Sequence, residues 1–404
     1  MPEPVIVATA RTPIGRAFKG SLVNERADDM ATFIVDTVLD QLPELDRTTV
    51  DDLMLGCGLP GGEQGFNMGR VVAVLAGMRN VPGCTITRYC SSSLQTIRMA
   101  SHAITAGEGD VFIAAGVEAV SRFMVGGSSD HTPNTQNPKF AAAHERSVAR
   151  AAGDQGPWTP AVGLPDVYID MGETAENVAE VENVSREEMD EYALLSQQRA
   201  VAAIDRGFFE REITPYTTSD GTVVTKDDGP RPDTTLEKLA SLKPAFRPNG
   251  RVTAGNACPL NDGAAAVVVM SDTKAAELGI TPRARIIASG VTGLDPEIMG
   301  LGPIEASRQA LARAGMTIDD IDLVEINEAF AAQVIPSYRQ LDIPLEKLNV
   351  MGGSIAVGHP FGMTGARITG TLLNALSWHD KTIGLETMCV GGGQGMAMVV
   401  ERLS

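Results

Sequence analysis

Short apolar runs alternate with amphipathic segments along most of this chain. Residues 5–15 have the pattern of a strand that runs into a turn, and residues 27–42 carry apolar positions at helical spacing. A further run, 84–89, leads up to Cys90. The apolar positions after it have helical spacing and define a helix that closes at Gly107: Leu94, Ile97, Ser101 and Ile104. The pattern predicts alternating strands and helices, with Cys90 where a strand turns into a helix.

The last third of the chain repeats this plan, so two similar halves are predicted. A strand over 283–293 is followed by a helix over 304–315 and by a strand over 320–329 that carries Asn327 near its end. The run LNVMGG (348–353) predicts a strand ahead of His359, and TIGLETMCV (382–390) predicts one that reaches Cys389. The helices after Cys90 and after His359 then occupy equivalent positions. We expect the active groups at the carboxyl ends of parallel strands, where open sheets bind ligands.

Between the halves the periodicity is lost. Pro, Asp, Asn and Gly crowd residues 128–170, and Ser185 with Glu188 forms a capping box ahead of one strong helix. A long insertion at a strand end is usually a substrate-covering feature. The predicted domains are residues 1–119 plus 261–281, an inserted loop domain over 120–260, and residues 282–404.

Composition excludes several classes of protein. The chain has 404 residues, 43% hydrophobic content and 42 glycines, which fits two or three domains with tightly packed cores. No apolar run approaches a membrane span, and the start lacks a signal pattern, so we expect a cytoplasmic protein. The cysteines are odd in number and scattered, which argues against disulfides and a zinc site, and nothing indicates a metal: Cys57, Cys84, Cys90, Cys258 and Cys389.

The net charge of −18 argues against nucleic acid or an anionic membrane as partner. A small anionic ligand needs only a local basic patch. One stretch offers five cations, although scattered solvated charge explains it equally well: Arg231, Lys238, Lys243, Arg247 and Arg251.

Three side chains in small-residue turns are the candidates for chemistry. Cys90 precedes three serines, and a thiol at the positive end of a helix favours thiolate, although a buried core cysteine is the commoner case. His359 lies between Gly358 and Pro360, a turn in which the proline sets the first residue of the next helix. Cys389 begins CVGGGQG, whose glycines let amides approach a ligand or simply form a tight turn. Asn327 is either a turn former or a group that fixes a water or a carbonyl.

Several blocks resemble those of the thiolase family, in the same order and spacing: MGETAENVA (171–179), VTAGNACPLNDGAA (252–265), NEAFAAQ (327–333), GGSIAVGHPFGMTGAR (352–367) and CVGGGQG (389–395). The resemblance spans essentially the whole chain. It implies a five-layered αβαβα fold built from two duplicated βαβαβαββ halves, with a loop domain inserted in the first.

The resemblance also implies roles for single residues. Cys90 would be the acylated nucleophile, and His359 would deprotonate it or the thiol of coenzyme A (CoA). Cys389 would exchange the α-proton of acetyl-CoA. Asn327 would hold a water in one oxyanion hole, and the amides of Cys90 and Gly391 would form the second. The substrate- or CoA-binding residues would be Arg231, Cys258, Met171 and Ser92.

The chain departs from many relatives at Thr87, Ser93, Asp170 and Cys258, which bear on substrate size and CoA contacts. The resemblance implies an acyltransferase that cleaves 3-ketoacyl-CoA to acetyl-CoA, as in fatty-acid β-oxidation, with CoA as co-substrate, no permanently bound cofactor, and a homodimer or homotetramer. The alternatives are a biosynthetic thiolase that condenses two acetyl-CoA, a Cys-His-Asn thioesterase, and a non-catalytic CoA-binding relative.

Overall fold

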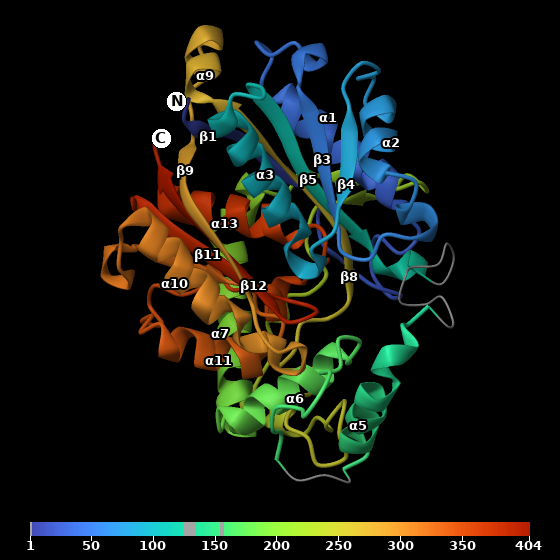
Figure 1. The fold of residues 1–404 in the computed structure, drawn as a ribbon. Coiled ribbons are helices and arrows are strands. Elements are labelled where there is room, and N and C mark those ends of the chain that lie inside the picture. The colour runs from blue at the N-terminus through green and yellow to red at the C-terminus, as the bar shows by residue number, and fades with distance from the viewer. Residues whose placement is uncertain (1, 124–134, 154–156) are drawn as a thin grey trace.

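The strands of both halves join in one sheet. The computed structural model describes residues 2–123, 135–153 and 157–404. Within these residues the main sheet has ten strands, in the order β10-β11-β12-β9-β1-β8-β5-β3-β4, with β2 (Gly15–Arg16) paired to β8. The halves meet where β1 and β9 run antiparallel, with Val5 opposite Arg285. The thiolase-like architecture expected from the sequence is therefore present as a mixed α/β sheet with helices on both sides (Figure 1).

The first half follows the expected order of elements, with β5 and β8 as the closing antiparallel pair. Its bounds are β1 Pro4–Arg11, α1 Ala27–Asp40, β3 Asp52–Cys57, α2 Met68–Leu75, β4 Gly83–Ile86, α3 Ser92–Ala106, β5 Val111–Ala119, β8 Asn261–Ser271 and α9 Asp272–Leu278. The helix α3 ends at Gly107, whose φ of 76° provides the left-handed cap.

The second half repeats this order with one strand fewer. Its bounds are β9 Ala284–Gly293, α10 Gly302–Ala314, β10 Leu323–Ile326, α11 Ala331–Gln340, α12 Ser354–Val357, α13 Thr364–Trp378, β11 Ile383–Val390 and β12 Gln394–Arg402. The strand expected over 348–353 is reduced to a single bridge between Leu348 and Val324. The side chain of Asn349 takes its place, because it accepts the Ile326 N–H at 2.8 Å and donates to the Ile326 carbonyl at 2.9 Å.

Two helices lie at the centre of the molecule. The helix α3 packs on β3 and β5, α13 packs on β10 and β11, and the two helices pack on each other. On the outer faces, α1 and α2 cover the first half and α10 covers the second (Figure 1). The helices that follow the Cys90 turn and the His359 loop are therefore neighbours between the two halves.

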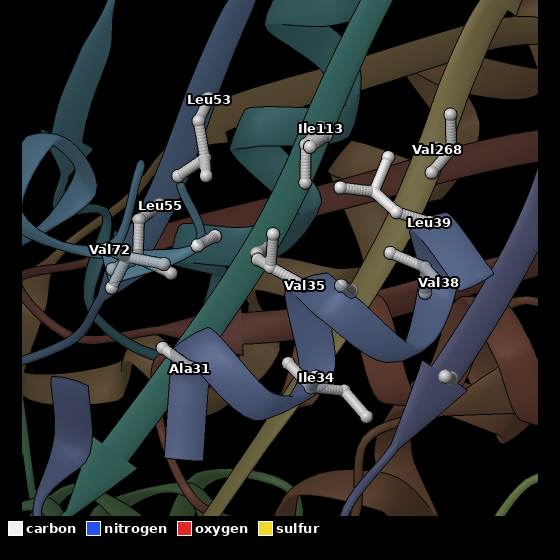
Figure 2. Packing of buried hydrophobic residues seen from close by; sticks show 14 of the residues in the cluster. Ala31, Ile34, Val35, Val38, Leu39, Leu53, Leu55, Val72, Ile113 and Val268 are labelled. Carbon is white, nitrogen blue, oxygen red and sulfur yellow. The ribbon is translucent and has the colours of Figure 1, made fainter. Parts of the chain in front are cut away.

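The outer layer of the first half is fixed by an apolar face of α1. Its buried residues follow helical spacing, with Ala31, Ile34, Val35 and Val38 all fully buried. They form one cluster with side chains of β3, α2, β5 and β8, namely Leu53, Leu55, Val72, Ile113 and Val268. Figure 2 shows Val35 on the side of α1 that faces Ile113 and Val72.

The insertion lies between two adjacent strands, because β5 ends at Ala119 and β8 begins at Asn261. Its elements are α5 Ala141–Ala151, α6 Met171–Val181, α7 Arg186–Asp205, β6 Tyr216–Thr217, β7 Val223–Val224 and α8 Leu236–Ala240. The capping box of Ser185 and Glu188 opens α7, as expected. Figure 1 shows α5 and α6 together at one end of the molecule. The domain division itself stays a prediction. No helix in the described ranges combines the length and the apolar character that crossing a bilayer requires.

Candidate active site

Cys90 lies in a strained turn. It belongs to a single 3-10 turn, Tyr89–Ser91, between β4 and α3, and 8% of its surface is exposed. Tyr89 has a φ of 43°, which is unusual for a bulky residue and is typical of functional sites when the surroundings enforce it. The hydroxyl of Ser92 accepts the Arg88 N–H at 2.9 Å and donates to the Tyr89 carbonyl at 2.6 Å. This serine therefore holds the shape of the turn.

Cys389 lies at the end of β11 and is fully buried. The chain then reverses into β12, so that Val390 pairs with Gln394. Gly392 and Gly393 have φ values of 73° and 79°, which favour glycine. The turn brings the amide of Gly391 to the thiol of Cys90. The two cysteines lie within electrostatic range of each other, so the two halves each contribute a thiol to one site.

His359 is held on several sides in the loop between α12 and α13. It is 1% exposed, and its backbone N–H donates to Asn261 Oδ1 at 2.9 Å. Its ring Nδ1 lies 2.6 Å from Thr364 Oγ1, and its Nε2 lies 3.3 Å from Asn327 Nδ2. The ring also makes an edge contact with Phe361, with 5.3 Å between centroids. The helix expected to begin at Pro360 begins only at Thr364. Residues 361–363 form a turn, and the Pro360 carbonyl accepts the amides of Met363 and Thr364.

Asn327 directly follows β10 and continues the pairing with β11 by donating its backbone N–H to the Thr387 carbonyl at 2.9 Å. Its side chain is buried and bonded at both ends, because Oδ1 accepts a 2.6 Å hydrogen bond from Ser354 Oγ. Ser354 in turn accepts a 2.7 Å bond from Arg367 Nη2. Asn327 therefore stands between His359 and a buried guanidinium.

The surroundings of the Cys90 thiol favour its protonated form. Burial raises its pKa to about 12, with a smaller contribution from the charge of Glu118, while the amide of Gly391 opposes the shift. The expectation that the helix start favours thiolate gains no support from this site, since loss of water outweighs the nearby amides. A nucleophilic role for Cys90 would require a base.

Burial, together with the charge of Arg367, lowers the pKa of His359 to about 3, so its imidazole is neutral at physiological pH. A neutral ring can accept a proton. Burial also raises the pKa of Cys389 well above its usual value, and the charges of Cys90 and Cys258 add to this effect. The site thus holds neutral thiols beside a neutral imidazole.

A cavity of about 940 Å³ opens beside Cys90. Cys90, Gly391 and Met171 line it, whereas His359, Asn327 and Cys389 do not belong to its lining residues. Ser92 is buried outside the cavity with its hydroxyl occupied, so its predicted substrate contact gains no support. Cys258 is also absent from this wall, but its backbone N–H bonds the Ala329 carbonyl, which places it beside the segment that carries Asn327.

The basic stretch divides into structural and free cations. Lys238 pairs with Asp233, Arg247 pairs with Glu173, and Arg251 donates to backbone carbonyls at 2.7 Å. For these three cations the structure favours scattered charge over a patch that binds an anion. Arg231 is largely exposed. Partial burial of its guanidinium lowers its pKa, and the nearby charge of Arg16 lowers it further.

Two buried carboxylates that sequence reasoning missed fix the loops around the site. Glu118, at the end of β5, accepts the amides of Gly58 at 2.7 Å and Gly362 at 2.8 Å, so it ties the first half to the His359 loop. Glu328 accepts bonds from Tyr192 at 2.9 Å and from the Ile355 amide at 3.1 Å. The blocks that carry Glu328, Ser354, Thr364 and Arg367 were visible in the sequence, but nothing in them separates a supporting side chain from a reacting one.

The chain matches models of the thiolase N-terminal domain over residues 4–273 and of the thiolase C-terminal domain over residues 280–402. A relative from Pseudoalteromonas translucida, described as 3-ketoacyl-CoA thiolase, is 43% identical, and the match covers 100% of both chains. Among solved structures, the Bacillus anthracis acetyl-CoA acetyltransferase has 39% identity and a TM-score of 0.85, covering 100% of this chain and 99% of that one. Human mitochondrial 3-ketoacyl-CoA thiolase in complex with CoA has 34% identity and a TM-score of 0.86, covering 100% and 98%.

Proposed function

Because the chain belongs to the thiolase family, we propose that it catalyses thiolytic cleavage of 3-ketoacyl-CoA through an acyl-enzyme on Cys90. The observation that carries this proposal is the pair of thiols: the buried Cys389 lies within electrostatic range of Cys90, beside the amide of Gly391. A hydrolase needs one nucleophile and a water. Carbon–carbon cleavage needs, besides the nucleophile, an acid that protonates the departing carbon, and we assign this role to Cys389.

In the first half-reaction, His359 Nε2 accepts the proton of the Cys90 thiol as the sulfur attacks the C3 carbonyl. The C2–C3 bond breaks, and its electron pair passes to C2 as the enolate of acetyl-CoA. Cys389 protonates C2, and acetyl-CoA leaves. In this proposal the amides of Cys90 and Gly391 donate hydrogen bonds to the oxyanion on the acyl carbon.

In the second half-reaction, the Cys389 thiolate takes the proton of the CoA thiol, and the CoA sulfur attacks the acyl-enzyme. Cys90 leaves as thiolate and recovers its proton from the His359 imidazolium. Both proton carriers return to their starting state, so every step can also run in the synthetic direction. The two neutral thiols and the neutral imidazole of the free protein are the correct starting state for this cycle.

The cavity favours an acyl chain longer than acetoacetyl. Its volume lies at the upper end of the range for pockets that take drug-sized ligands. Large apolar and aromatic side chains supply much of its wall: Leu59, Tyr89, Phe140, Val167, Ile169 and Phe361. Among the described lining residues none is lysine or arginine, which favours a neutral tail over a second carboxylate.

We propose that Arg231, in the insertion, contacts the CoA handle. Arg231 and Arg16 form the pair of neighbouring cations in this region, and two guanidinium groups at short range suit a phosphate. We place the protein in a reducing compartment, the cytoplasm, since its five cysteines are free and two of them react as thiols. The homodimer or homotetramer stays a prediction, which light scattering on the purified protein tests.

A kinetic panel tests the proposed function. Cleavage of 3-ketoacyl-CoA substrates from four carbons upward is measured with and without free CoA, for the wild type and for Cys90→Ala. We expect CoA-dependent cleavage that is lost in the variant, with kcat/KM rising beyond four carbons. Release of free acid without CoA would indicate a thioesterase, and preference for the four-carbon substrate would indicate the biosynthetic alternative.

A further inference from the structure

The most complete polar arrangement outside the reacting groups is a chain of hydrogen bonds through the His359 ring. It runs from Arg367 through Ser354 and Asn327 to His359, with distances of 2.7, 2.6 and 3.3 Å, and then to Thr364 at 2.6 Å. The Thr364 hydroxyl donates a hydrogen bond to the Pro360 carbonyl at 2.7 Å. Every side chain in it is at most 2% exposed, so water does not compete for these groups.

The two ends of this chain give it a direction. A guanidinium has only donors, and a carbonyl has only an acceptor. Ser354 accepts from Arg367, so its single proton goes to Asn327 Oδ1, and the Asn327 amide must present its NH₂ group to His359. A flipped amide would leave the Ser354 proton without an acceptor. At the other end, the Thr364 hydroxyl donates to the Pro360 carbonyl, so it accepts a hydrogen bond from the His359 ring.

We propose that Arg367 and Ser354 are positioning residues that fix the tautomer of His359, with the proton on Nδ1 and the lone pair on Nε2. The ring nitrogen that faces Asn327 is thereby kept unprotonated and able to take up a proton. The inference rests on the proposed function only in naming that proton as the one from Cys90.

Charge keeps the ring in the neutral form that this assignment requires. Arg367 lies within electrostatic range of His359 and makes no ion pair within 4 Å among the described residues, while Glu325 partly offsets its charge from a greater distance. A permanent cation behind Asn327 disfavours imidazolium and so keeps the ring in its neutral form between turnovers. Arg367 therefore acts twice, by orienting the amide and by opposing early protonation.

The test reads the tautomer directly. The protein has five histidines, so ¹⁵N-histidine labelling gives a small set of ring signals, and His359→Asn assigns the one that matters. At pH 8 the wild type is expected to show Nε2 at the unprotonated position and Nδ1 at the protonated position. In Ser354→Ala both signals are expected to move toward averaged values, and kcat for thiolysis to fall between 10- and 100-fold with little change in KM.

Three further variants separate this role from packing. Ser354→Thr keeps the hydroxyl and is expected to restore both the ring signals and kcat. Arg367→Lys keeps the charge but shortens the reach to Ser354, and is expected to shift the ring signals if Ser354→Ala fails to fold. Ser337→Ala is the matched control, because it also removes a buried hydroxyl. The Ser337 hydroxyl donates to the Gln333 carbonyl at 2.7 Å and takes no part in the hydrogen bonds through His359.

A wild-type ring protonated on Nε2 would overturn the proposal without any variant. An unchanged tautomer and unchanged kcat in Ser354→Ala would also overturn it. If the tautomer is as expected but the protein performs no thiolysis, the positioning role stands and the proposed function fails, so the two failures are distinguishable.

Discussion

The protonated state of Cys90 has a measurable consequence, namely a steep pH dependence of its reaction with a neutral alkylating agent. Burial and the charge of Glu118 raise its pKa to about 12. At pH 7 the thiolate fraction is then roughly 10⁻⁵, against roughly 3% for an ordinary cysteine. The sign is fixed, because below its pKa a thiol gains about tenfold in thiolate for each unit of pH.

The assay follows iodoacetamide modification of Cys90 by peptide mass spectrometry from pH 6 to pH 10, in the absence of substrate. The rate is expected to rise about tenfold per unit over the whole range, as the thiolate fraction does. Cys84 is an internal reference, since it is half-buried and burial raises its pKa to about 11. Cys389→Ser removes the second thiol of the site as a source of ambiguity.

A rate that is already constant between pH 6 and pH 8 would refute this reasoning. Such a plateau means that Cys90 and His359 form a thiolate–imidazolium pair in the free protein. The pKa of His359, lowered to about 3 by burial and Arg367, predicts the opposite. Acylation by substrate is expected to stay nearly independent of pH over this range, because neutral His359 takes the proton within the reaction step.

Three further changes probe separate parts of the structure. Asn327→Asp replaces the donor that faces His359 Nε2 with an acceptor. The pKa of His359, measured by ring NMR, is expected to rise, and kcat for thiolysis is expected to fall about 100-fold. An unchanged pKa would show that Asn327 does not donate to His359 Nε2. Gly116→Ala places a Cβ against the carbonyl of Gly362 in the His359 loop. Both the midpoint of urea unfolding and kcat are therefore expected to fall. Full activity in this variant would show that the loop tolerates displacement. Ile34→Ala empties part of the α1 core and is expected to cost about 2–5 kcal/mol of unfolding free energy with unchanged kcat per folded molecule, so lost activity in fully folded protein would contradict a purely structural role.

The alternating pattern was sufficient to predict the framework of both halves. The capping box at Ser185 and the glycine cap at Gly107 were confirmed, because local hydrogen-bonding groups determine where those helices begin and end. The helix α5 was missed, since Ala143 is its one buried residue and leaves no apolar periodicity to detect. The strand at 348–353 was overpredicted, because the side chain of Asn349 satisfies the backbone groups of Ile326 that a strand would pair.

For the site, the sequence indicated where chemistry could reside but not its electrostatic state. The turns around Cys90, His359 and Cys389 were visible because glycine, proline and serine mark them locally. The pKa of Cys90 depends on how completely distant segments exclude water, which no local pattern records. The supporting role of Glu118 is also invisible in any local pattern, because its partners Gly58 and Gly362 lie 60 and 244 residues away along the chain.

The central packing of α3 against α13 has a consequence for how this protein can be divided. Cys90, the proposed nucleophile, precedes α3, and His359, the proposed base, precedes α13. The two helices pack on each other from opposite halves. A chain severed between α9 and β9 would yield two fragments that each expose an apolar seam and hold only part of the chemistry. Recovery of turnover after mixing them would therefore report reassociation of the seam itself, which makes this protein a natural split-enzyme sensor.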